Sequence, residues 1–164
     1  MEKVALAVMR LQPLHNGHKL LIDTMLAEAQ TAVVAIGSIQ ARNERNPFSY
    51  DQRVQMVRAL YPDADRVRVL GVADIGAPTP RAWAEYVLKQ IDACALPRPT
   101  CYYAGNEETF WFKGILALRG VDRIGAGKGI SATQIRTDLA AGKSVDDRVP
   151  DKVLALIKEW RYEA

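Results

Sequence analysis

The sequence predicts an α/β fold, a doubly wound parallel sheet with helices on both of its faces. Short runs of β-branched and small apolar residues alternate along the chain with segments of helical period. Such alternation is typical of parallel strands joined by right-handed crossovers, which cover both faces of the sheet. With 164 residues, of which 49% are hydrophobic, the chain can form one core, so we expect a single domain over residues 1–164.

Four segments have the composition of buried strands. Residues 3–9, 31–37 and 66–71 are short apolar runs, and residues 100–104 form a fourth candidate. In a doubly wound sheet the ligand crevice lies at the carboxyl ends of the strands, where the loop after the first strand opens. We therefore expect functional residues to follow the strands.

Three helices are expected between these strands, because residues there follow the helical period. The residues that mark this period are Leu20, Leu21, Thr24, Met25 and Glu28, then Val54, Met56, Val57 and Leu60, and finally Trp83, Val87 and Ile91. The segment 76–80 contains a glycine and two prolines, and we expect it to be a loop within the domain.

The carboxy-terminal part of the chain contains two further helix candidates. Residues 131–139 form one, and the sequence Ala-Gly-Lys at residues 141–143 is a typical helix stop. Pro150 favours the start of the last helix. The apolar residues of that helix fall on one stripe, which comprises Val153, Leu154, Ile157 and Trp160. We expect both helices to pack back on the sheet.

Charge and cysteine content indicate which class of ligand the chain binds and in which compartment it works. The formal net charge is +3, from 22 basic and 19 acidic residues that are spread along the chain. This distribution suits a small anionic ligand and gives no reason to expect a nucleic-acid partner. The two cysteines suit neither a C-x-x-C pair nor a secreted disulfide framework. Because we find no signal peptide and no apolar segment of membrane-spanning length, we expect a cytoplasmic protein without a membrane partner.

The sharpest feature is the segment at residues 12–18, Gln-Pro-Leu-His-Asn-Gly-His, which follows the first expected strand and precedes the first helix. Pro13 restricts the turn, Gly17 allows a ligand close to the backbone, and the helix amino terminus offers N–H groups to an anion. His15 and His18 can then donate hydrogen bonds to one phosphate group as charge develops on a leaving pyrophosphate.

Two other interpretations of these histidines are open. They can be solvent-exposed loop residues, or they can be two ligands of a metal ion. Zinc takes three or four protein ligands, and no cysteine or carboxylate cluster lies nearby in the sequence to complete such a set. The position after the first strand favours the phosphate site, and we expect no protein-held metal.

A second feature, residues 129–136 with the sequence Gly-Ile-Ser-Ala-Thr-Gln-Ile-Arg, begins one of the late helices. Ser131 and Gln134 fit a capping box, which by itself requires no function. Thr133 and Arg136 lie beside the same helix start and can form a second anion site, with the guanidinium on phosphate oxygens. A solvated arginine on a helix face is the alternative.

Together these motifs resemble the nucleotidylyltransferase superfamily, which carries H-x-G-H after the first strand and I-S-x-T-x-x-R late in the chain. Residues 10–18 are similar to the signature G-R-F-Q-P-x-H-x-G-H of the archaeal-type nicotinamide mononucleotide (NMN) adenylyltransferases. Residues 41–48, 52–53 and 149–150 resemble further stretches of that group, so the similarity extends over most of the chain. The resemblance implies a Rossmann-like fold of the nucleotidylyltransferase type.

The resemblance also implies a reaction. ATP and NMN give NAD and pyrophosphate by direct in-line attack of the NMN phosphate on the ATP α-phosphorus, with Mg²⁺ bound to the phosphates. Catalysis of such a transfer consists of positioning and charge stabilisation, without a covalent enzyme intermediate. Members of the family are commonly homo-oligomers, so the implied partners are ATP, NMN and further copies of the chain.

Transferred position by position, the resemblance makes His15, His18 and Arg136 the catalytic residues, with His18 near the α-phosphate. The implied ATP-binding residues are Gln12, Gly17, Gly105, Asn106, Lys128, Ser131 and Thr133. On the acceptor side, Arg10 stands where the signature arginine contacts phosphate, and Trp83 stands where an aromatic residue lies against the nicotinamide ring. Asp74 is a candidate contact to the amide or the ribose.

Several of these residues have a structural alternative. Trp83 shares a helical stripe with two core candidates, so a packing role is equally open. Gly105 and Asn106 also suit a turn after the fourth strand. The glycine-rich residues 125–129 do not form a P-loop, because Ala126 stands where the lysine must be. We expect a flexible loop over the phosphates, from which Lys128 approaches the triphosphate.

The chain also departs from the signature. Met9 and Leu11 stand where the signature has glycine and phenylalanine, at positions that the resemblance places close to the bound mononucleotide. Transfer of AMP or CMP to phosphopantetheine, FMN or a polyol phosphate is therefore an alternative function, and a nucleotide-binding regulator without turnover is another. Glu107 and Glu108 add negative charge near the adenosine side, for which we find no role beyond a helix start.

Overall fold

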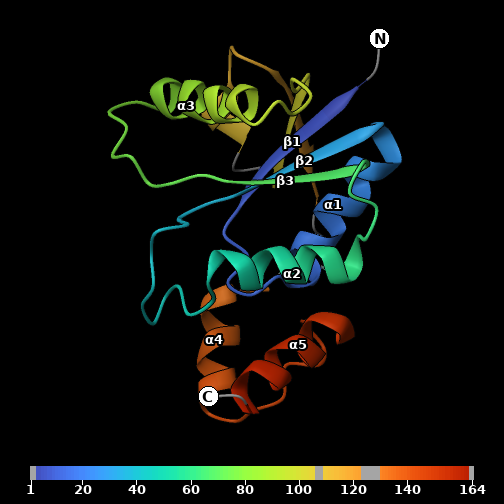
Figure 1. Cartoon of the computed structure of the whole chain (residues 1–164), viewed down its shortest axis with the longest axis vertical. Helices are drawn as coiled ribbons and strands as arrows, with labels where there is room; N and C mark the ends of the chain where they lie inside the picture. Colours follow the sequence, from blue (N-terminus) through green and yellow to red (C-terminus); the bar gives the residue numbers. More distant parts are fainter. Residues whose placement is uncertain (1–2, 106–108, 123–129, 163–164) are drawn as a thin grey trace.

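A computed structural model of the chain describes residues 3–105, 109–122 and 130–162. The described residues form one five-stranded sheet in which neighbouring strands are parallel (Figure 1). The strands are β1 Val4–Met9, β2 Thr31–Ile36, β3 Val67–Gly71, β4 Cys101–Gly105 and β5 Ala117–Val121. The helices are α1 Asn16–Glu28, α2 Tyr50–Leu60, α3 Pro80–Ala93, the short 3-10 helix η1 Thr109–Phe112, α4 Ala132–Ala140 and α5 Asp151–Tyr162. Each of the four strands expected from the sequence is confirmed within one residue at either end.

The strand order β3-β2-β1-β4-β5 places the first strand at the centre of the sheet. β1 is in register with β2 along its whole length, from Val4 opposite Thr31 to Met9 opposite Ile36. The winding direction reverses between β1 and β4, because β2 and β3 are added on one side and β4 and β5 on the other. The loops that leave β1 and β4 therefore diverge and open a crevice at the carboxyl edge of the sheet.

Side chains of the strands point alternately into two cores, one on each face of the sheet. Ala5 and Ala7 of β1 join the core that contains α1 and α2, whereas Val4 and Leu6 join the core covered by α3. Because both faces exclude water, the inner strands are nearly continuous apolar runs. Helices on both faces confirm the predicted doubly wound architecture (Figure 1).

The two carboxy-terminal helices extend the layer formed by α1 and α2. α5 packs on α2, on the side that faces away from the sheet (Figure 1). Val153 and Ile157 of α5 are buried there, and Ile135 of α4 is fully buried in the same core. α4 and α5 therefore add to the helices that cover this face of the sheet, and α5 is held there by α2.

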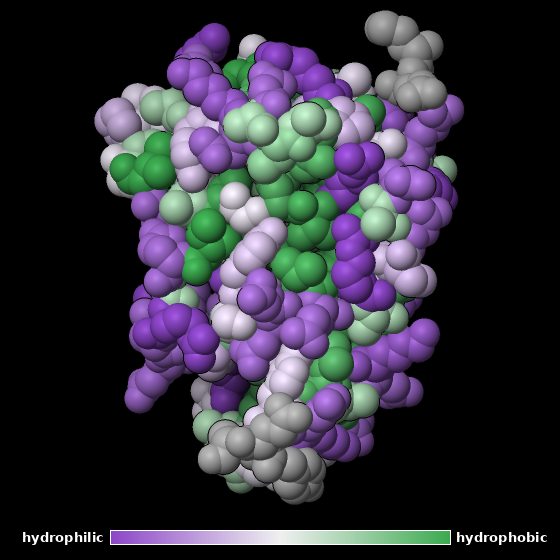
Figure 2. All heavy atoms as spheres, viewed as in Figure 1, coloured by the Kyte–Doolittle hydropathy of each residue, from purple (hydrophilic) through white to green (hydrophobic). Residues whose placement is uncertain are grey.

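The sequence pattern does not predict β5 or η1. β5 is an edge strand in which Ala117 and Leu118 are exposed, and it also contains an arginine and a glycine. An edge strand buries only part of its surface, so it needs no continuous apolar run. At the opposite edge, Figure 2 shows hydrophobic side chains gathered over β3, between α2 and α3.

Gly71, the last residue of β3, leaves no room for a side chain. A Cβ atom at this position would lie 2.8 Å from Cγ2 of Ile39 and 2.9 Å from Cε1 of Tyr50. We predict that Gly71→Ala lowers the free energy of unfolding by about 1–3 kcal/mol, because the half-buried side chains of Ile39 and Tyr50 must shift to admit the new methyl group. Urea unfolding measures this change.

Gly37→Ala is the matched control. The nearest atoms to a Cβ at Gly37 lie 4.0 Å away, which is an ordinary contact. This variant should change the free energy of unfolding by less than about 0.5 kcal/mol. Equal losses in the two variants would contradict the packing explanation.

Candidate active site

The loop from β1 to α1 holds both histidines at the amino terminus of α1. His15 is the N-cap residue, and its Nδ1 accepts a hydrogen bond from the Gly17 N–H at 3.0 Å. His18 accepts the His15 N–H through its own Nδ1 at 3.1 Å. The two rings are stacked, with their centroids 3.8 Å apart. The histidines thus form a reciprocal capping box, which fixes both imidazoles at the start of the helix.

These hydrogen bonds also determine which ring nitrogen carries the proton. A nitrogen that accepts a backbone N–H bears no proton, so the neutral ring carries its proton on Nε2. The Nε2–H groups of His15 and His18 are therefore hydrogen-bond donors at the positive end of the α1 dipole. Two such donors at a helix amino terminus suit an anion such as phosphate.

Gln12 is buried in the same loop and is only 1% exposed. Its Nε2 donates to the carbonyl oxygen of Phe48 at 3.0 Å, and its Oε1 accepts the Phe48 N–H at 2.9 Å. This pair of hydrogen bonds joins the β1–α1 loop to the segment that precedes α2. The side chain of Gln12 is therefore occupied in bracing the two loops, and the ATP contact expected of this residue stays a prediction. The N–H of Gly17 is likewise occupied, by His15.

α4 brings Arg136 into direct contact with the histidine loop, from a position 124 residues further along the chain. Its Nη1 donates to the carbonyl oxygen of Gln12 at 2.9 Å, and its Nη2 donates to Oγ1 of Thr133 at 3.3 Å. Ile135, the neighbour of Arg136, is fully buried and anchors the helix. The two loop-to-helix junctions that the sequence singles out therefore meet at one place.

Ser131 caps α4, since its Oγ accepts the N–H of Gln134 at 3.2 Å. The capping box expected here is only half formed. The side chain of Gln134 does not return to Ser131 but donates to Oδ1 of Asp138 at 2.9 Å, one turn further along the helix. Ser131 and Thr133 nevertheless lie at the positive end of the α4 dipole, next to Arg136.

Five arginines give this part of the molecule a positive potential. Burial lowers the pKa of Arg136, and the charges of Arg45 and Arg10 lower it further. The pKa of Arg53 is lowered chiefly by burial and then by Arg10 and Arg42. None of these five takes part in an ion pair within the described part of the chain. Like charges held together without an ion-pair partner among the described residues attract anions, so the site suits a polyphosphate.

Arg53, which the sequence marks only through the family resemblance, ties the strand ends together. Its Nη1 donates to the carbonyl oxygens of Arg10 at 2.9 Å and Gly37 at 2.7 Å. Its Nε donates to the carbonyl oxygen of Ser49 at 3.2 Å. The guanidinium thus fixes the residues that follow β1 and β2 relative to the start of α2, while its own positive charge stays buried.

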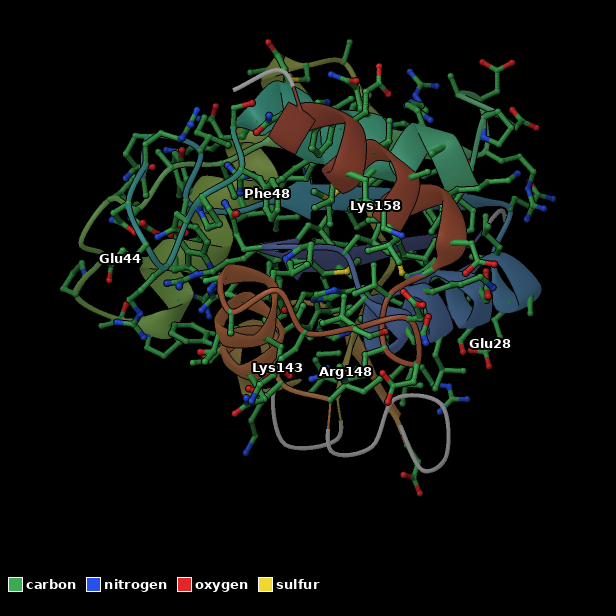
Figure 3. All side chains as sticks on the ribbon, turned by 90° about the horizontal axis from the view of Figure 1, so that it is seen from below. Glu28, Glu44, Phe48, Lys143, Arg148 and Lys158 are labelled. Atoms are coloured by element: carbon green, nitrogen blue, oxygen red, sulfur yellow. The ribbon has the colours of Figure 1, made fainter. Side chains whose placement is uncertain are left out.

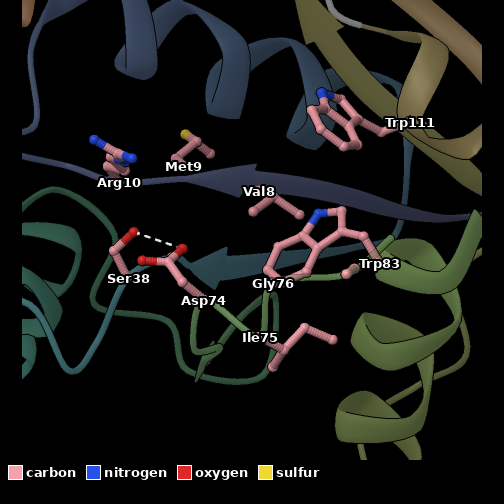
Figure 4. A pocket seen from close by; sticks show the side chains of 11 residues that line it. Val8, Met9, Arg10, Ser38, Asp74, Ile75, Gly76, Trp83 and Trp111 are labelled. Carbon is pink, nitrogen blue, oxygen red and sulfur yellow. Dashed lines mark hydrogen bonds between the residues drawn. The ribbon is translucent and has the colours of Figure 1, made fainter. Parts of the chain in front are cut away.

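A cavity of about 380 Å³ opens at the carboxyl ends of β1 and β2. Its wall includes all three residues expected on the acceptor side, Arg10, Asp74 and Trp83 (Figure 4). Arg10 follows β1, Asp74 follows β3, and Trp83 lies in the first turn of α3. The fold therefore brings these residues together from three separate segments. The apolar part of the wall includes Val8, Met9, Ile75 and Trp111.

Within this wall, Trp83 both packs and faces the cavity. It is half-buried against the α3 core, and its ring centroid lies 5.5 Å from that of Tyr86. Both alternatives open from the sequence, packing and ligand contact, are therefore compatible with its position. Asp74 accepts a hydrogen bond from the Ser38 hydroxyl at 3.0 Å (Figure 4).

The two departures from the family signature differ in position. Met9 lines the cavity, whereas Leu11 is fully buried in the core. Leu11 adopts a φ of 57°, in the left-handed region, and its side chain joins the core with α1 and α2. The expectation that Leu11 lies next to the acceptor is therefore wrong, and only Met9 can change that contact.

Gly105, expected on the ATP side, ends β4 at the carboxyl edge of the sheet, where it pairs with Val121 of β5. Four further residues of interest lie outside the described residues, as does the rest of the stretch 125–129. They are Asn106, Glu107, Glu108 and Lys128.

Among the residues that the structure describes, no group of three or more His, Cys, Asp or Glu side chains could hold a metal ion. No helix in the described ranges is long and apolar enough to cross a bilayer.

An ion pair that the sequence does not reveal joins α4 to the segment before α5, and this segment also contacts the start of α1. Arg148 Nη2 lies 2.8 Å from Oδ2 of Asp138, and both side chains are largely buried. The carbonyl oxygen of Arg148 accepts the N–H of Asn16, the first residue of α1, at 2.8 Å. Figure 3 shows Arg148 in the segment between α4 and α5, next to α1. This segment therefore holds the amino terminus of α1 and the helix that carries Arg136 at a fixed separation.

Comparison with known proteins identifies the class. Residues 10–138 match the cytidylyltransferase-like family, and the chain belongs to this family of nucleotidyltransferases. The nicotinamide-nucleotide adenylyltransferase of Methanospirillum hungatei is 31% identical over 94% of this chain and 87% of the relative. The enzyme of the same name from Thermococcus kodakarensis is 29% identical over 97% of this chain and 84% of the relative. The family and the enzyme class predicted from the sequence are confirmed.

Solved structures share the fold. A bifunctional NMN adenylyltransferase/ADP ribose pyrophosphatase from Francisella tularensis matches 96% of this chain with a TM-score of 0.77 and 21% identity. This chain spans 49% of that protein. A second structure of that bifunctional protein, complexed with AMP and a manganese ion, matches 99% of this chain with a TM-score of 0.74.

The ion pair of Asp138 with Arg148 predicts how the stability of the fold depends on pH. Hydrogen bonds from Gln134 and Arg148 lower the pKa of Asp138 below its ordinary value of 3.8. The carboxylate therefore stabilises the fold fully above pH 3.8, and this contribution is lost as the pH falls through the lowered pKa. Thermal melts of Asp138→Asn should show a lower Tm than the wild type at pH 7, and the difference should shrink as the pH falls below 3.8.

Asp147→Asn is the control, because Asp147 also pairs with Arg148, at 3.3 Å, but its side chain is 81% exposed. An exposed pair contributes little, so this variant should melt like the wild type at every pH. A difference between Asp138→Asn and the wild type that does not depend on pH would contradict the role of the ionised carboxylate.

Proposed function

We propose that this chain transfers AMP from ATP to nicotinamide mononucleotide, which forms NAD and releases pyrophosphate. The curated relatives are named for this activity. The observation that carries the proposal is that two sites share a border. Arg10 lines the cavity for the acceptor, and in the same loop the carbonyl oxygen of Gln12 accepts a hydrogen bond from Arg136, the residue expected on the triphosphate. A phosphate bound at Arg10 would therefore lie beside the triphosphate site.

In this proposal the triphosphate lies between the two helix amino termini. The Nε2–H groups of His15 and His18 contact it from α1, and Ser131, Thr133 and Arg136 contact it from α4. A phosphate oxygen of NMN attacks the α-phosphorus in line, and the bond from that phosphorus to the bridging oxygen of the pyrophosphate breaks. The attacking oxygen is already ionised at neutral pH, so no general base is needed. The enzyme contributes alignment and fixed donors toward the developing charge.

Magnesium fits the substrate better than it fits the protein. The described side chains around the site are imidazoles, guanidiniums and the two hydroxyls of Ser131 and Thr133, whereas Mg²⁺ prefers carboxylate and carbonyl oxygens and keeps several waters. A solved relative contains AMP together with a manganese ion. We propose that Mg²⁺ enters as the complex with ATP, where it neutralises charge on the departing pyrophosphate.

Cys94 and Cys101 are free thiols, which suits a reducing compartment. We therefore propose that the reaction takes place in the cytoplasm. We further propose that the chain forms a homo-oligomer, as the family resemblance implies.

The test is a pyrophosphate-release assay with direct detection of NAD. ATP and NMN should give NAD and pyrophosphate in equal amounts, and phosphopantetheine, FMN and a polyol phosphate should be poor acceptors with either ATP or CTP. Turnover with one of these acceptors and none with NMN would overturn the assignment. Binding of ATP without any product would instead indicate a nucleotide-binding regulator.

His18 allows its capping and catalytic roles to be separated. In His18→Asn the amide oxygen takes the place of Nδ1 and can still accept the His15 N–H, but the Nε2–H donor is lost. We predict that His18→Ala and His18→Asn both lower kcat about a hundredfold, because a preorganised donor to the developing charge is missing. Only His18→Ala should also lower the Tm, because it loses the cap. An unchanged kcat in both variants would remove His18 from the mechanism.

A further inference from the structure

We propose that β3 is a contact surface between two copies of this chain, whose sheets join edge to edge across a twofold axis at Leu70. The inference rests on the homo-oligomer put forward under the proposed function and deepens it, because it assigns the surface and the symmetry. The strand order β3-β2-β1-β4-β5 leaves β3 at one edge of the sheet. Such an edge presents backbone N–H and C=O groups that can pair with another strand.

Alternate residues of β3 direct their backbone groups away from β2. Val72, the residue after β3, donates its N–H to the carbonyl oxygen of Ile36 in β2 at 2.8 Å. Because the direction of the backbone groups alternates along a strand, Val69 and Gly71 point theirs to the free edge. Neither residue has a hydrogen-bond partner for these outward groups in the described part of the chain. The middle of β3 therefore offers open donors and open acceptors.

The outward groups on either side of this stretch are satisfied within the chain. Val67 donates its N–H to the carbonyl oxygen of Asp63 at 3.0 Å, and its own carbonyl oxygen accepts Nη1 of Arg58 at 2.7 Å. Ala73 donates its N–H to the hydroxyl of Tyr86 at 3.0 Å. The open part of the edge is therefore limited to the two outward-facing residues between Val67 and Ala73.

These open groups determine the register of a paired edge. A closed twofold interface requires the two β3 strands to be antiparallel, since each copy presents the same surface. When Leu70 lies opposite Leu70 of the second copy, Val69 faces Gly71 of that copy and exchanges both N–H···O bonds with it. The axis repeats the exchange, so every open donor and acceptor of both copies is paired. Other registers place an open residue opposite Val67 or Ala73, whose N–H groups are already bonded.

The surface beside this edge is apolar. Val69 of β3 and Val54 of α2 are half-buried against the core that contains α1 and α2. Figure 2 shows hydrophobic side chains gathered over β3, between α2 and α3. β3 contains neither a proline nor a bulge, the usual obstacles to pairing at an edge. Contact with a second copy removes this apolar surface from water.

α2 supplies charge complementarity across the axis. It runs antiparallel to β3, because Tyr50 at its start lies against Gly71 and Arg58 near its end reaches Val67. Asp51 and Arg58 are about two turns apart and share one face of the helix. The axis reverses one copy relative to the other, which brings Asp51 of each copy toward Arg58 of the other. Neither residue forms an ion pair within the described ranges.

The mass of the assembly in solution is the first test. Val69→Pro removes an outward N–H and places its ring in the path of the second strand, whereas an edge strand tolerates proline within its own sheet. Sedimentation equilibrium without substrates should show an even number of copies for the wild type and for Val69→Thr, the control that keeps the N–H. Val69→Pro should form an assembly of half that mass. Circular dichroism melts check that each variant is folded.

The second test leaves the backbone unchanged. Asp51→Lys places like charges opposite each other at both related positions and should raise the Kd of the pair at least about tenfold, as should Arg58→Glu. An equimolar mixture of these two variants should associate within about threefold of the wild-type Kd, because opposite charges again meet at both positions. Asp147→Lys is the control. It makes the same charge change at a side chain that is 81% exposed, between α4 and α5, and should leave the Kd unchanged.

Two results would overturn the inference alone. A folded Val69→Pro with the wild-type mass would place the contact elsewhere, and a mixture as weakly associated as the single variants would exclude the axis at Leu70. If Val69→Pro does not fold, the mixture decides. A monomeric wild type would overturn the inference together with the proposed homo-oligomer. The proposed reaction is decided separately, by the formation of NAD.

Discussion

The hydrogen bond from the guanidinium of Arg136 to the carbonyl oxygen of Gln12 is the contact on which the rest of the site depends. It joins a loop near the beginning of the chain to a helix near its end, so that two helix amino termini face one region. The side chain of Gln12 in turn binds Phe48, and Arg53 binds the residues that follow β1 and β2. The carboxyl edge of the sheet is thus crosslinked by polar contacts, while apolar packing holds the strands and helices beneath it. Such crosslinks keep donors in place before a substrate arrives.

The same contacts explain how the molecule tolerates so much positive charge in one place. Arg53 is fully buried, and Arg136 is partly so, yet neither has a carboxylate partner among the described residues. Their charges are stabilised by carbonyl oxygens, which accept hydrogen bonds without neutralising the charge. The resulting site favours a polyanion, and its unpaired cations lower the stability of the fold, as is common at functional sites. Leu11 and Ser38, two non-glycine residues with positive φ, lie in the loops of this region.

Much of the fold could be predicted from the sequence, because strands buried on both faces and amphipathic helices leave plain periodic patterns. The sequence does not predict β5, because an edge strand with exposed Ala117 and Leu118 has no such pattern. The histidines were found by their position after the first strand, but their capping role was not, because histidine is an unusual cap and the stacking of its rings depends on the loop geometry. The pairing of Asp138 with Arg148, the brace at Gln12 and the position of Trp111 arise from contacts between distant segments. Local pattern does not carry such information, although the family resemblance did lead to Arg10, Asp74 and Trp83, which the fold brings to one cavity.

The most direct measurement is a crystal structure of the chain with an ATP analogue in which a methylene group replaces the oxygen between the α- and β-phosphates. If the two junctions act on one triphosphate, its phosphate oxygens will lie within hydrogen-bonding distance of Nε2 of His18 and of the guanidinium of Arg136 in the same molecule. A phosphate chain that contacts only one of these groups, or that binds at another part of the surface, would contradict the account.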